Sequence, residues 1–386
     1  MAYKNKFAIC GVGYTKQGKV PGRSALSFHV EAAAAAIADA GLSPHDVDGL
    51  FLYRFFDVLE GDTYFNAFTA AEQLGLRPSA LSEEFYCTRS WLTHALGLLE
   101  LGVCKYIVVS YGDNARSSRR SFSKELEGDA PTDELAAFGD ISTLAKYAML
   151  ARRAMYEDGT GPDVWGEIAV AHRRWACLNP IASMYGKPLT KEEYLETPYL
   201  VEPFRNLDAT PVSDGGRAIV LTTADRARAL RKHPLVTVRG FGQANVPDAP
   251  YKLMHKDPNS AACVAGRKAF EMAGVTPADI DACYIYDCFT YTVEATLRDY
   301  GFFEPKASRE FLDASRIGPG GDFALNTSGG MLSEAYFMGL TGVSEAVMQL
   351  MGRCGERQLA NCGLALVNDN GAVIQSNETM ILERGE

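Results

Sequence analysis

The sequence has few of the features that mark metal-binding, disulfide-rich or membrane proteins. Its nine cysteines are scattered singly, without a Cys-x-x-Cys pair, a Cys/His cluster or the dense even spacing of a disulfide scaffold. No apolar run approaches the roughly 18 residues that a membrane-spanning helix needs. We therefore expect no metal site, no permanently bound cofactor and no membrane span.

The first residues also lack the apolar stretch of a secretory signal. Residues 1–6 lead directly into the strand-like residues 7–13, so we expect a cytoplasmic protein with reduced cysteines. The net charge of −10 at pH 7 argues against a nucleic-acid partner, because such partners need a surplus of basic residues. At 386 residues, the chain is long enough for two domains or one large duplicated unit.

An internal repeat favours the duplicated unit. Residues 40–53 align without a gap with residues 273–286, and most positions are identical or similar. Each copy follows a predicted helix, over residues 25–40 and 262–273. Gly41 and Gly274 suit the ends of these helices, and a Ser/Thr-Pro-x-Asp turn and a strand come next.

A second theme recurs in both halves. A helix over about residues 88–101 precedes the strand-like residues 105–111, and the apolar stretch 334–350, which we also expect to be helical, precedes residues 364–371. Alternating helices and apolar strands predict α/β layers with buried sheets. We divide the chain into halves at residues 1–230 and 231–386.

A long insertion at about residues 112–205 interrupts the first half. It contains an amphipathic helical pattern over residues 144–155 and a loop-rich segment with Pro180, Gly186 and Pro188. Insertions on a repeated scaffold often shape a binding site, so this insertion could do so. Alternatively, it could be a dimerisation arm.

Four short motifs, taken in order, resemble the thiolase superfamily and its sterol-carrier-protein-x-like branch. The motifs are residues 212–220, Tyr286-Asp-Cys-Phe, Asn326-Thr-Ser-Gly-Gly and Gly339-Leu-Thr-Gly, and the resemblance covers essentially the whole chain. It implies a duplicated thiolase fold of five layers, αβαβα, a homodimer, and a coenzyme A thioester as substrate.

The chain departs from this branch where thiolases keep their catalytic residues. Tyr286 stands where a His-Asp-Cys-Phe box has histidine, and Tyr336 stands where a Gly-His-Pro motif has histidine. Counting back from Gly102 leaves either Phe85 or Cys87 at the position of the nucleophile. A reactive cysteine needs a lowered thiol pKa, which a helix N-terminus at Cys87 could provide.

Two tyrosines in these places resemble the lipid-transfer-protein-2-like aldolases that cleave steroid side chains. That group implies retro-aldol cleavage of a β-hydroxyacyl-CoA and a partner of the DUF35 type, with zinc only in the partner. It also implies Tyr286 as the base, Tyr336 as the acid and a third tyrosine, for which Tyr251 is the nearest candidate. Either Tyr286 or Tyr336 could instead be a buried aromatic residue whose hydroxyl caps a backbone group.

The glycine-rich segments are the candidate contacts to coenzyme A. They lack a P-loop lysine and a dinucleotide fingerprint, so tight turns and close backbone approach are the expected use. The backbone of Asn370-Gly371 could donate to the thioester oxygen, or could form a plain turn. The candidate positions are Asn326, Gly329, Gly330, Asn370 and Gly371.

Three functions follow from these observations. The first is an acyl-CoA-dependent carbon-carbon lyase acting on a bulky, possibly steroidal, β-hydroxyacyl-CoA, because retro-aldol cleavage needs no covalent intermediate. The second is a thiolase or acyltransferase that uses Cys87 on a 3-oxoacyl-CoA. The third is a non-catalytic carrier of acyl-CoA or lipid.

Overall fold

The computed structural model describes residues 3–54, 66–85, 90–118, 142–246 and 260–385. Within these ranges, none of the helices is both long enough and apolar enough to pass through a bilayer. Two candidate site residues, Cys87 and Tyr251, lie outside the described residues.

Five strands of the first half form one side of a continuous ten-stranded sheet. These strands are β1 (Phe7–Tyr14), β2 (Gly49–Arg54), β3 (Ala80–Phe85), β4 (Tyr106–Asn114) and β7 (Asp214–Thr223). The accompanying helices are α1 (Ala25–Asp39), η1 (Pro44–Asp46), α2 (Ala67–Leu74), α3 (Trp91–Glu100) and α8 (Ala224–Leu230).

The second half contributes the other five strands. They are β8 (Val236–Asn245), β9 (Ala282–Tyr284), β10 (Ala324–Leu325), β11 (Leu364–Gly371) and β12 (Ser376–Arg384). Its helices are α9 (Ala261–Ala273), η5 (Pro277–Asp279), α10 (Thr290–Asp299), α11 (Ser308–Phe311), α12 (Ala314–Ile317), α13 (Gly330–Ser333), α14 (Gly339–Leu350) and η6 (Gly355–Arg357).

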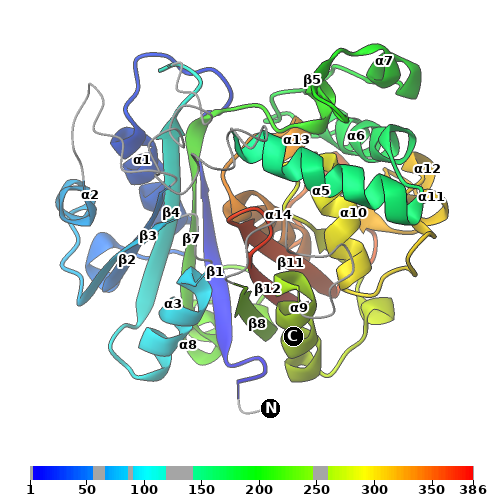
Figure 1. The fold of residues 1–386 in the computed structure, drawn as a ribbon. Helices are drawn as coiled ribbons and strands as arrows, with labels where there is room; N and C mark the ends of the chain where they lie inside the picture. Colours follow the sequence, from blue (N-terminus) through cyan, green and yellow to red (C-terminus); the bar gives the residue numbers. More distant parts are fainter. Residues whose placement is uncertain (1–2, 55–65, 86–89, 119–141, 247–259, 386) are drawn as a thin grey trace.

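The two halves have the same strand order. From the centre outward, the first runs β1-β7-β4-β2-β3 and the second runs β8-β12-β11-β9-β10. In each, the three outer strands are parallel and the next two are antiparallel. The halves meet where β1 pairs antiparallel with β8, as Figure 1 shows at the centre of the molecule.

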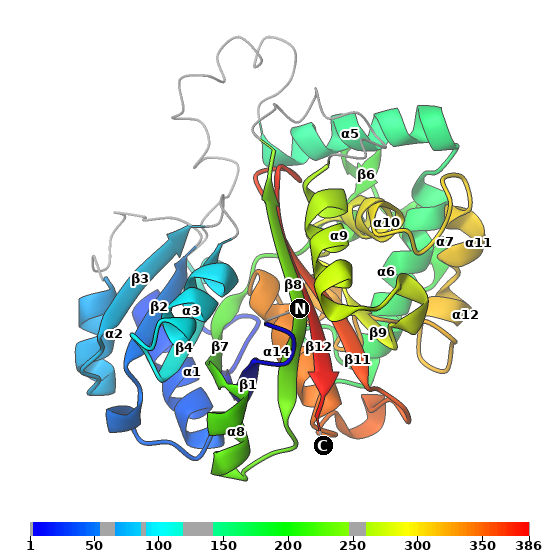
Figure 2. The same cartoon turned by 90° about the horizontal axis from the view of Figure 1, so that it is seen from below.

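Helices cover both faces of each half and fill the space between them. Helix α1 packs on β1, β4 and β7, and α9 packs on β8 and β12. Helix α14 contacts strands of both halves, and the backbone of α3 reaches Glu378 of β12, so these two helices form the middle layer (Figure 2). The layers confirm the predicted duplicated αβαβα fold, whereas the division at residue 230 stays a prediction.

Repeated residues explain the repeated elements. Ser24 and Ser260 cap α1 and α9, accepting bonds from the backbone amides three residues later at 3.2 and 3.1 Å. Gly41 and Gly274 follow the helices with φ of +75° and +66°, a conformation that favours glycine, as the sequence predicts.

The central strands lie unusually close to these helices. A Cβ atom added at Gly13 of β1 would lie 2.0 Å from the carbonyl oxygen of Ala32 in α1. A Cβ at Gly242 of β8 would lie 2.0 Å from the carbonyl oxygen of Ala265 in α9. Since Ala32 and Ala265 are equivalent positions of the repeat, both halves use the same glycine-alanine packing.

One predicted helix begins later than expected. The apolar pattern of residues 334–350 predicts a continuous helix, but α13 ends at Ser333 and α14 begins at Gly339. Met338, the residue before α14, has φ of +51°, which interrupts the helical path. The prediction is wrong for residues 334–338, and Tyr336 therefore lies in a loop.

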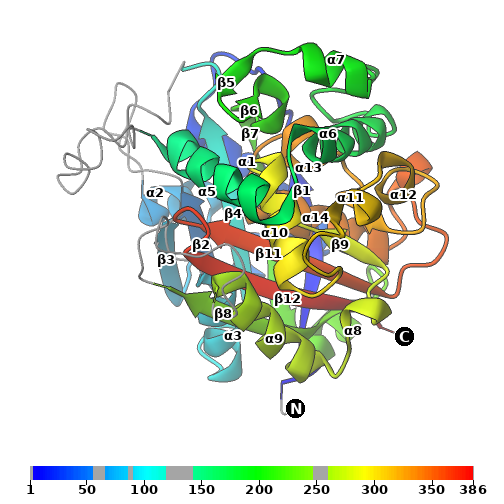
Figure 3. The ribbon, with the colours of Figure 1, turned by 45° about the vertical axis from the view of Figure 1, so that its right-hand side comes forward.

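The insertion of the first half folds over the second half. It contains α5 (Thr143–Asp158), α6 (Pro162–Cys177), α7 (Lys191–Glu196), β5 (Tyr199–Val201), β6 (Phe204–Arg205) and η3 (Asn206–Asp208). Helix α6 contacts α10, α12 and α13, where the indole of Trp165 donates to Glu294 at 2.6 Å and that of Trp175 donates to the Ile317 carbonyl at 3.1 Å. Figure 3 shows this cover over the second half.

We predict that Gly13→Ala and Gly242→Ala each lower the free energy of unfolding by about 1–3 kcal/mol, because the new methyl group meets helix backbone that cannot rotate away. Gly97→Ala in α3 is the control, since its Cβ would meet no atom within 4 Å. It should be neutral or stabilise by about 0.5–1 kcal/mol. Urea unfolding measures all three, and a loss for Gly97→Ala equal to the others would contradict the packing argument.

Candidate active site

The two candidate tyrosines, both from the second half, meet in the interior of the molecule. The hydroxyl oxygens of Tyr286 and Tyr336 lie 2.9 Å apart, at hydrogen-bonding distance. Both side chains are buried, and their rings are nearly perpendicular, with an interplanar angle of 77°. The structure therefore places two phenol groups, 50 residues apart in the chain, in direct contact.

Hydrogen bonds from other elements fix Tyr286, which lies just after strand β9. Its backbone amide donates to Oδ1 of Asn368 at 2.7 Å, and its carbonyl accepts from the hydroxyl of Thr292 at 2.9 Å. Because both backbone groups are bound by side chains from other elements, the ring has little freedom to shift.

Asp287, the next residue, fastens this turn to two other elements. Its carboxylate accepts from the backbone amides of Met331 and Leu332 at 2.8 and 3.2 Å, in the first turn of α13. It also lies 2.9 Å from Nδ1 of His172, a fully buried side chain on α6. A Cβ at Gly330 would lie 2.1 Å from this carboxylate, so only glycine fits there.

The loop after α13 fixes Tyr336. Its backbone amide donates to the Ser213 hydroxyl at 3.3 Å. The neighbouring residues both bind the Thr341 hydroxyl. This hydroxyl donates to the carbonyl of Ala335 at 3.1 Å and accepts from the backbone amide of Phe337 at 3.0 Å. Thr341 belongs to the first turn of α14, so the loop is tied to the helix that follows it.

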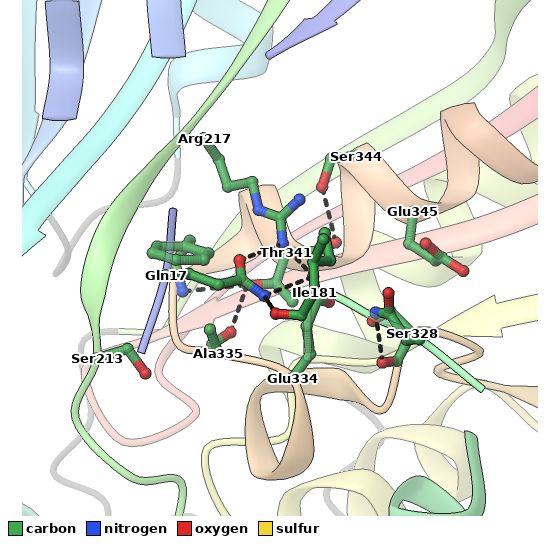
Figure 4. Close-up of polar contacts among 12 residues, drawn as sticks. Gln17, Ile181, Ser213, Arg217, Ser328, Glu334, Ala335, Thr341, Ser344 and Glu345 are labelled. Atoms are coloured by element: carbon green, nitrogen blue, oxygen red, sulfur yellow. Dashed lines mark hydrogen bonds and ion pairs between the residues drawn. The ribbon is translucent and has the colours of Figure 1, made fainter. Parts of the chain in front are cut away.

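A buried ion pair anchors the same loop to the other half of the molecule. Arg217 of β7 pairs with Glu334, and both side chains are almost fully buried (Figure 4). Arg217 also donates to Oε1 of Gln17 at 2.9 Å and lies over the Tyr14 ring at 4.0 Å. Burial raises the pKa of the Glu334 carboxyl, while the charge of Arg217 acts in the opposite direction.

Asn368 presents a free donor beside Tyr286. Its Oδ1 accepts from the Tyr286 amide, which fixes the orientation of the side-chain amide and leaves Nδ2 as the other end. Among the described residues, Nδ2 has no hydrogen-bond partner. Asn368 lines a cavity of about 10 Å³, the Asn368 pocket, together with Tyr286, Met338 and Gly339, and this cavity has room for about one water molecule.

Asn326 is a contrasting neighbour. Its Oδ1 accepts from the Ile285 amide at 2.8 Å, and its Nδ2 donates to the carbonyl of the same residue at 2.9 Å. Two buried asparagines thus hold consecutive residues of one turn. Asn326 uses both ends of its side chain for this task, whereas Asn368 uses only one.

Aromatic residues of the first half form a wall behind Tyr336. The ring of Tyr111 on β4 lies edge-on to that of Tyr336, with centroids 6.3 Å apart and an interplanar angle of 90°. Tyr53, its partner on β2, donates its hydroxyl to Asp369 of β11 at 2.6 Å. The site therefore lies between the two halves.

The remaining candidate positions have mainly structural contacts. Gly329 and Gly330 have φ of +102° and +62°, and a Cβ at Gly329 would lie 2.6 Å from that of Ala176 in α6, as close backbone approach predicts. Asn370 and Gly371 end β11, where the Asn370 amide donates to Oδ1 of Asp369 at 2.9 Å. The turn itself follows, at residues 372–374 with positive φ.

The site offers no evident nucleophile or metal ligand set in the part of the chain that the structure describes. Burial raises the pKa of the Cys288 thiol to about 12, so this residue stays protonated and unreactive. No group of three His, Cys, Asp or Glu side chains that could hold a metal ion occurs in the described ranges.

Two contributors were missed from the sequence. His172 lies in a stretch that reads as a basic surface helix, and its contact with Asp287 spans 115 residues, so no local pattern indicates it. Asn368 had a usable signal, because side chains alternate along a strand and Asn368 therefore points to the same face of β11 as the candidate Asn370.

A family model and two known proteins are similar to this chain. Residues 252–384 match the model of the family described as thiolase C-terminal domain-like. The 17-hydroxy-3-oxo-4-pregnene-20-carboxyl-CoA lyase of Mycobacterium tuberculosis is 33% identical over 365 residues, which are 89% of this chain and 91% of the lyase. A steroid side-chain-cleaving aldolase of Thermomonospora curvata is 32% identical, over 89% of this chain and 90% of the aldolase.

A solved structure agrees with the sequence relatives. The Ltp2-ChsH2(DUF35) aldolase superposes with a TM-score of 0.87 and 30% identity, covering 100% of this chain and 99% of that chain. These similarities confirm the predicted fold and the predicted class of activity, that of the aldolases and lyases acting on acyl-CoA. The chain therefore belongs to the thiolase superfamily, in the branch that holds the steroid side-chain-cleaving aldolases.

Proposed function

We propose that this chain is a carbon-carbon lyase that cleaves a bulky β-hydroxyacyl-CoA by a retro-aldol reaction. The observation that carries the proposal is the contact between the Tyr286 and Tyr336 hydroxyls, 2.9 Å apart in a buried site. Two phenols placed together can exchange a proton with each other and with a substrate between or beside them. They replace the two histidines that thiolases use at these positions.

In the proposed reaction, a base removes the proton of the β-hydroxyl group and the bond between the α and β carbons breaks. The β carbon leaves as a ketone or aldehyde, and the electron pair moves onto the α carbon and the thioester oxygen as an enolate. An acid then protonates the α carbon and gives the shorter acyl-CoA. Atoms and charge balance without a covalent bond to the enzyme.

We assign Tyr286 as the base and Tyr336 as the acid. A phenol has an unperturbed pKa of about 10, so a basic tyrosinate needs a hydrogen-bond donor beside it. The Tyr336 hydroxyl can be that donor at 2.9 Å. The surrounding backbone bonds, to Asn368, Thr292 and Ser213, hold both rings before substrate arrives. A role for Tyr251 as a third tyrosine stays a prediction.

We also propose that Asn368 stabilises the enolate. Its Nδ2 has no partner among the described residues, and Asn368 and the assigned base together line a pocket with room for about one oxygen atom. A fixed donor aimed at an oxygen that gains negative charge lowers the barrier, because no reorganisation is needed during the reaction. The oxygen concerned would be that of the thioester.

Replacement of either tyrosine by phenylalanine tests the central assignment. Tyr336→Phe and Tyr286→Phe should each lower kcat on a β-hydroxyacyl-CoA by roughly 10²–10⁴-fold, since general acid-base groups contribute that much. Tyr300→Phe is the matched control, because this buried hydroxyl bonds to Thr379 at 2.6 Å, away from the pair. A fully active Tyr336→Phe enzyme with an unchanged melting temperature would rule out the assignment.

Asn368→Asp tests the donor. The new carboxylate can still accept the Tyr286 amide, but it presents an acceptor to the pocket in place of the NH2 group. We expect kcat to fall by roughly 10²–10³-fold, as for the loss of one oxyanion donor. Asn326→Asp loses a structural hydrogen bond. It should lower the melting temperature and leave kcat less affected than Asn368→Asp does. Equal effects of the two variants on kcat and stability would show that Asn368 is only structural.

The size and chemistry of the substrate follow from the relatives. Two of them are by name a pregnene-carboxyl-CoA lyase and a steroid side-chain-cleaving aldolase, so we propose a steroidal acyl group. Contacts between coenzyme A and residues Asn326, Gly329, Gly330, Asn370 and Gly371 stay predictions. A panel of β-hydroxyacyl-CoA esters with steroidal, branched and linear chains distinguishes the possibilities, and preference for linear chains would contradict a steroidal substrate.

We further propose that the enzyme works as a homodimer with a DUF35 partner, which would carry the only zinc. The DUF35 part of the proposal is supported by the resemblance to the Ltp2-ChsH2(DUF35) aldolase, whose name includes such a protein. Co-expression with a candidate partner, followed by size-exclusion chromatography with light scattering, measures the assembly. A chain that elutes alone and is fully active would contradict the partnership.

The alternative function is a thiolase or acyltransferase that uses Cys87. This function remains an alternative because thiolases share the fold and a cysteine occurs near the position of their nucleophile. Mass spectrometry after incubation with acyl-CoA separates the two reactions, since a thiolase acylates Cys87 and a retro-aldolase leaves it unmodified. A non-catalytic carrier, the third function, would show no turnover of any β-hydroxyacyl-CoA, even with the partner.

A further inference from the structure

Arg173 on α6 is a buried arginine that forms no ion pair with any of the described residues. Its side chain is 92% buried, since the residue is 8% exposed. Its Nε donates to the Ser333 hydroxyl and its Nη1 donates to the Lys187 carbonyl, both at 3.2 Å. Both acceptors are neutral, and among the described residues no carboxylate forms an ion pair with the guanidinium, since Glu193 acts on it only at longer range.

The other buried arginines behave differently. Arg217 pairs with Glu334, and Arg357 pairs with Glu345 at 2.8 and 3.0 Å. Buried charges are costly unless they are paired, which is why such arginines face carboxylates. Burial lowers the pKa of Arg173, with Cys177 and Glu193 acting weakly in the other direction. Arg173 is the exception among the buried arginines of the described ranges.

Arg173 lines a cavity that is large enough for a ligand. This cavity encloses about 80 Å³, several times the space that one water molecule needs. Its other walls are mostly apolar and include Met184, Leu189, Leu207, Leu332 and Ser333. The cavity therefore joins one buried positive charge to a hydrocarbon-like surface.

The cavity at Arg173 is distinct from the Asn368 pocket, although residues of α13 line both. Gly330 and Met331 line the Asn368 pocket, whereas Leu332 and Ser333 line the cavity at Arg173. The two cavities share no lining residue, and neither candidate tyrosine lines the cavity at Arg173. It is a second site, and it does not depend on the reaction proposed above.

We propose that the cavity at Arg173 binds a carboxylate carried on an apolar body. Nη2 of Arg173 makes no bond to the described residues and, together with the second hydrogen of Nη1, can hold a carboxylate with two parallel bonds. The apolar walls cover the attached hydrocarbon. One guanidinium balances the single charge of a carboxylate, whereas a phosphate carries about −1.5 to −2 charges and would stay partly unpaired among apolar side chains.

Calorimetric titration of the whole chain with decanoate, decanamide and inorganic phosphate tests the proposal. Decanoate should bind the wild type, and Arg173→Met should weaken that binding at least about tenfold, because the carboxylate loses its charged hydrogen-bond donor. Decanamide and phosphate should bind weakly or not at all. Arg174→Met is the control, since this neighbour on the same helix is exposed and should leave binding unchanged.

Two further variants keep the test decisive if Arg173→Met fails to fold. Arg173→Lys keeps the charge and should retain part of the binding, and Leu207→Trp should fill the cavity and abolish binding with Arg173 in place. The proposal is overturned if the wild type does not bind decanoate, if decanamide binds equally well, or if phosphate alone gives the same affinity. It is also overturned if Arg173→Met or Leu207→Trp binds decanoate like the wild type.

Discussion

The buried ion pair between Arg217 and Glu334 is the constraint on which the site depends. It joins the sheet of the first half to the loop that carries Tyr336, two residues after Glu334. Removal of one partner of a buried pair typically destabilises a protein by about 3–5 kcal/mol, because the other charge is left without compensation. That loss is a large part of the roughly 5–15 kcal/mol by which a whole domain is stable. The loop therefore has little freedom to move away and break the pair. The contact between the tyrosine hydroxyls, and any proton transfer through it, follows from that fixed loop.

Much of the fold could be predicted from the sequence, because the residues of the repeat determine local structure such as helix ends. Gly41 and Gly274 end equivalent helices, and the alternation of helices and apolar strands predicts two similar sheets. The interruption between α13 and α14 could not be predicted in this way. Residues 334–350 have a helical apolar pattern, but Glu334 is bound by an arginine 117 positions earlier and the start of α13 is held by Asp287. These distant contacts override local helix propensity.

The sequence could predict which residues form the candidate site, but only part of how these residues contact one another. The motifs single out Tyr286 and Tyr336, yet nothing in the sequence says that their hydroxyl groups touch. Asn368 lies on the same face of its strand as a candidate residue, so strand alternation could have indicated it. His172 could not be found, since its role depends on the way in which the insertion folds back. The tyrosine contact strengthens the case for aldol cleavage over thiolysis, because phenols exchange protons and offer no thiol for acyl transfer.

The path of the insertion has a consequence for how the molecule is assembled. Helix α6 belongs to the first half by sequence, but it buries faces of α10, α12 and α13 in the second half and supplies the histidine that contacts Asp287. Residues 231–386 on their own would expose those faces and lose that contact. The second half thus repeats the topology of the first, but its packing is completed by a segment that the sequence places in the other half.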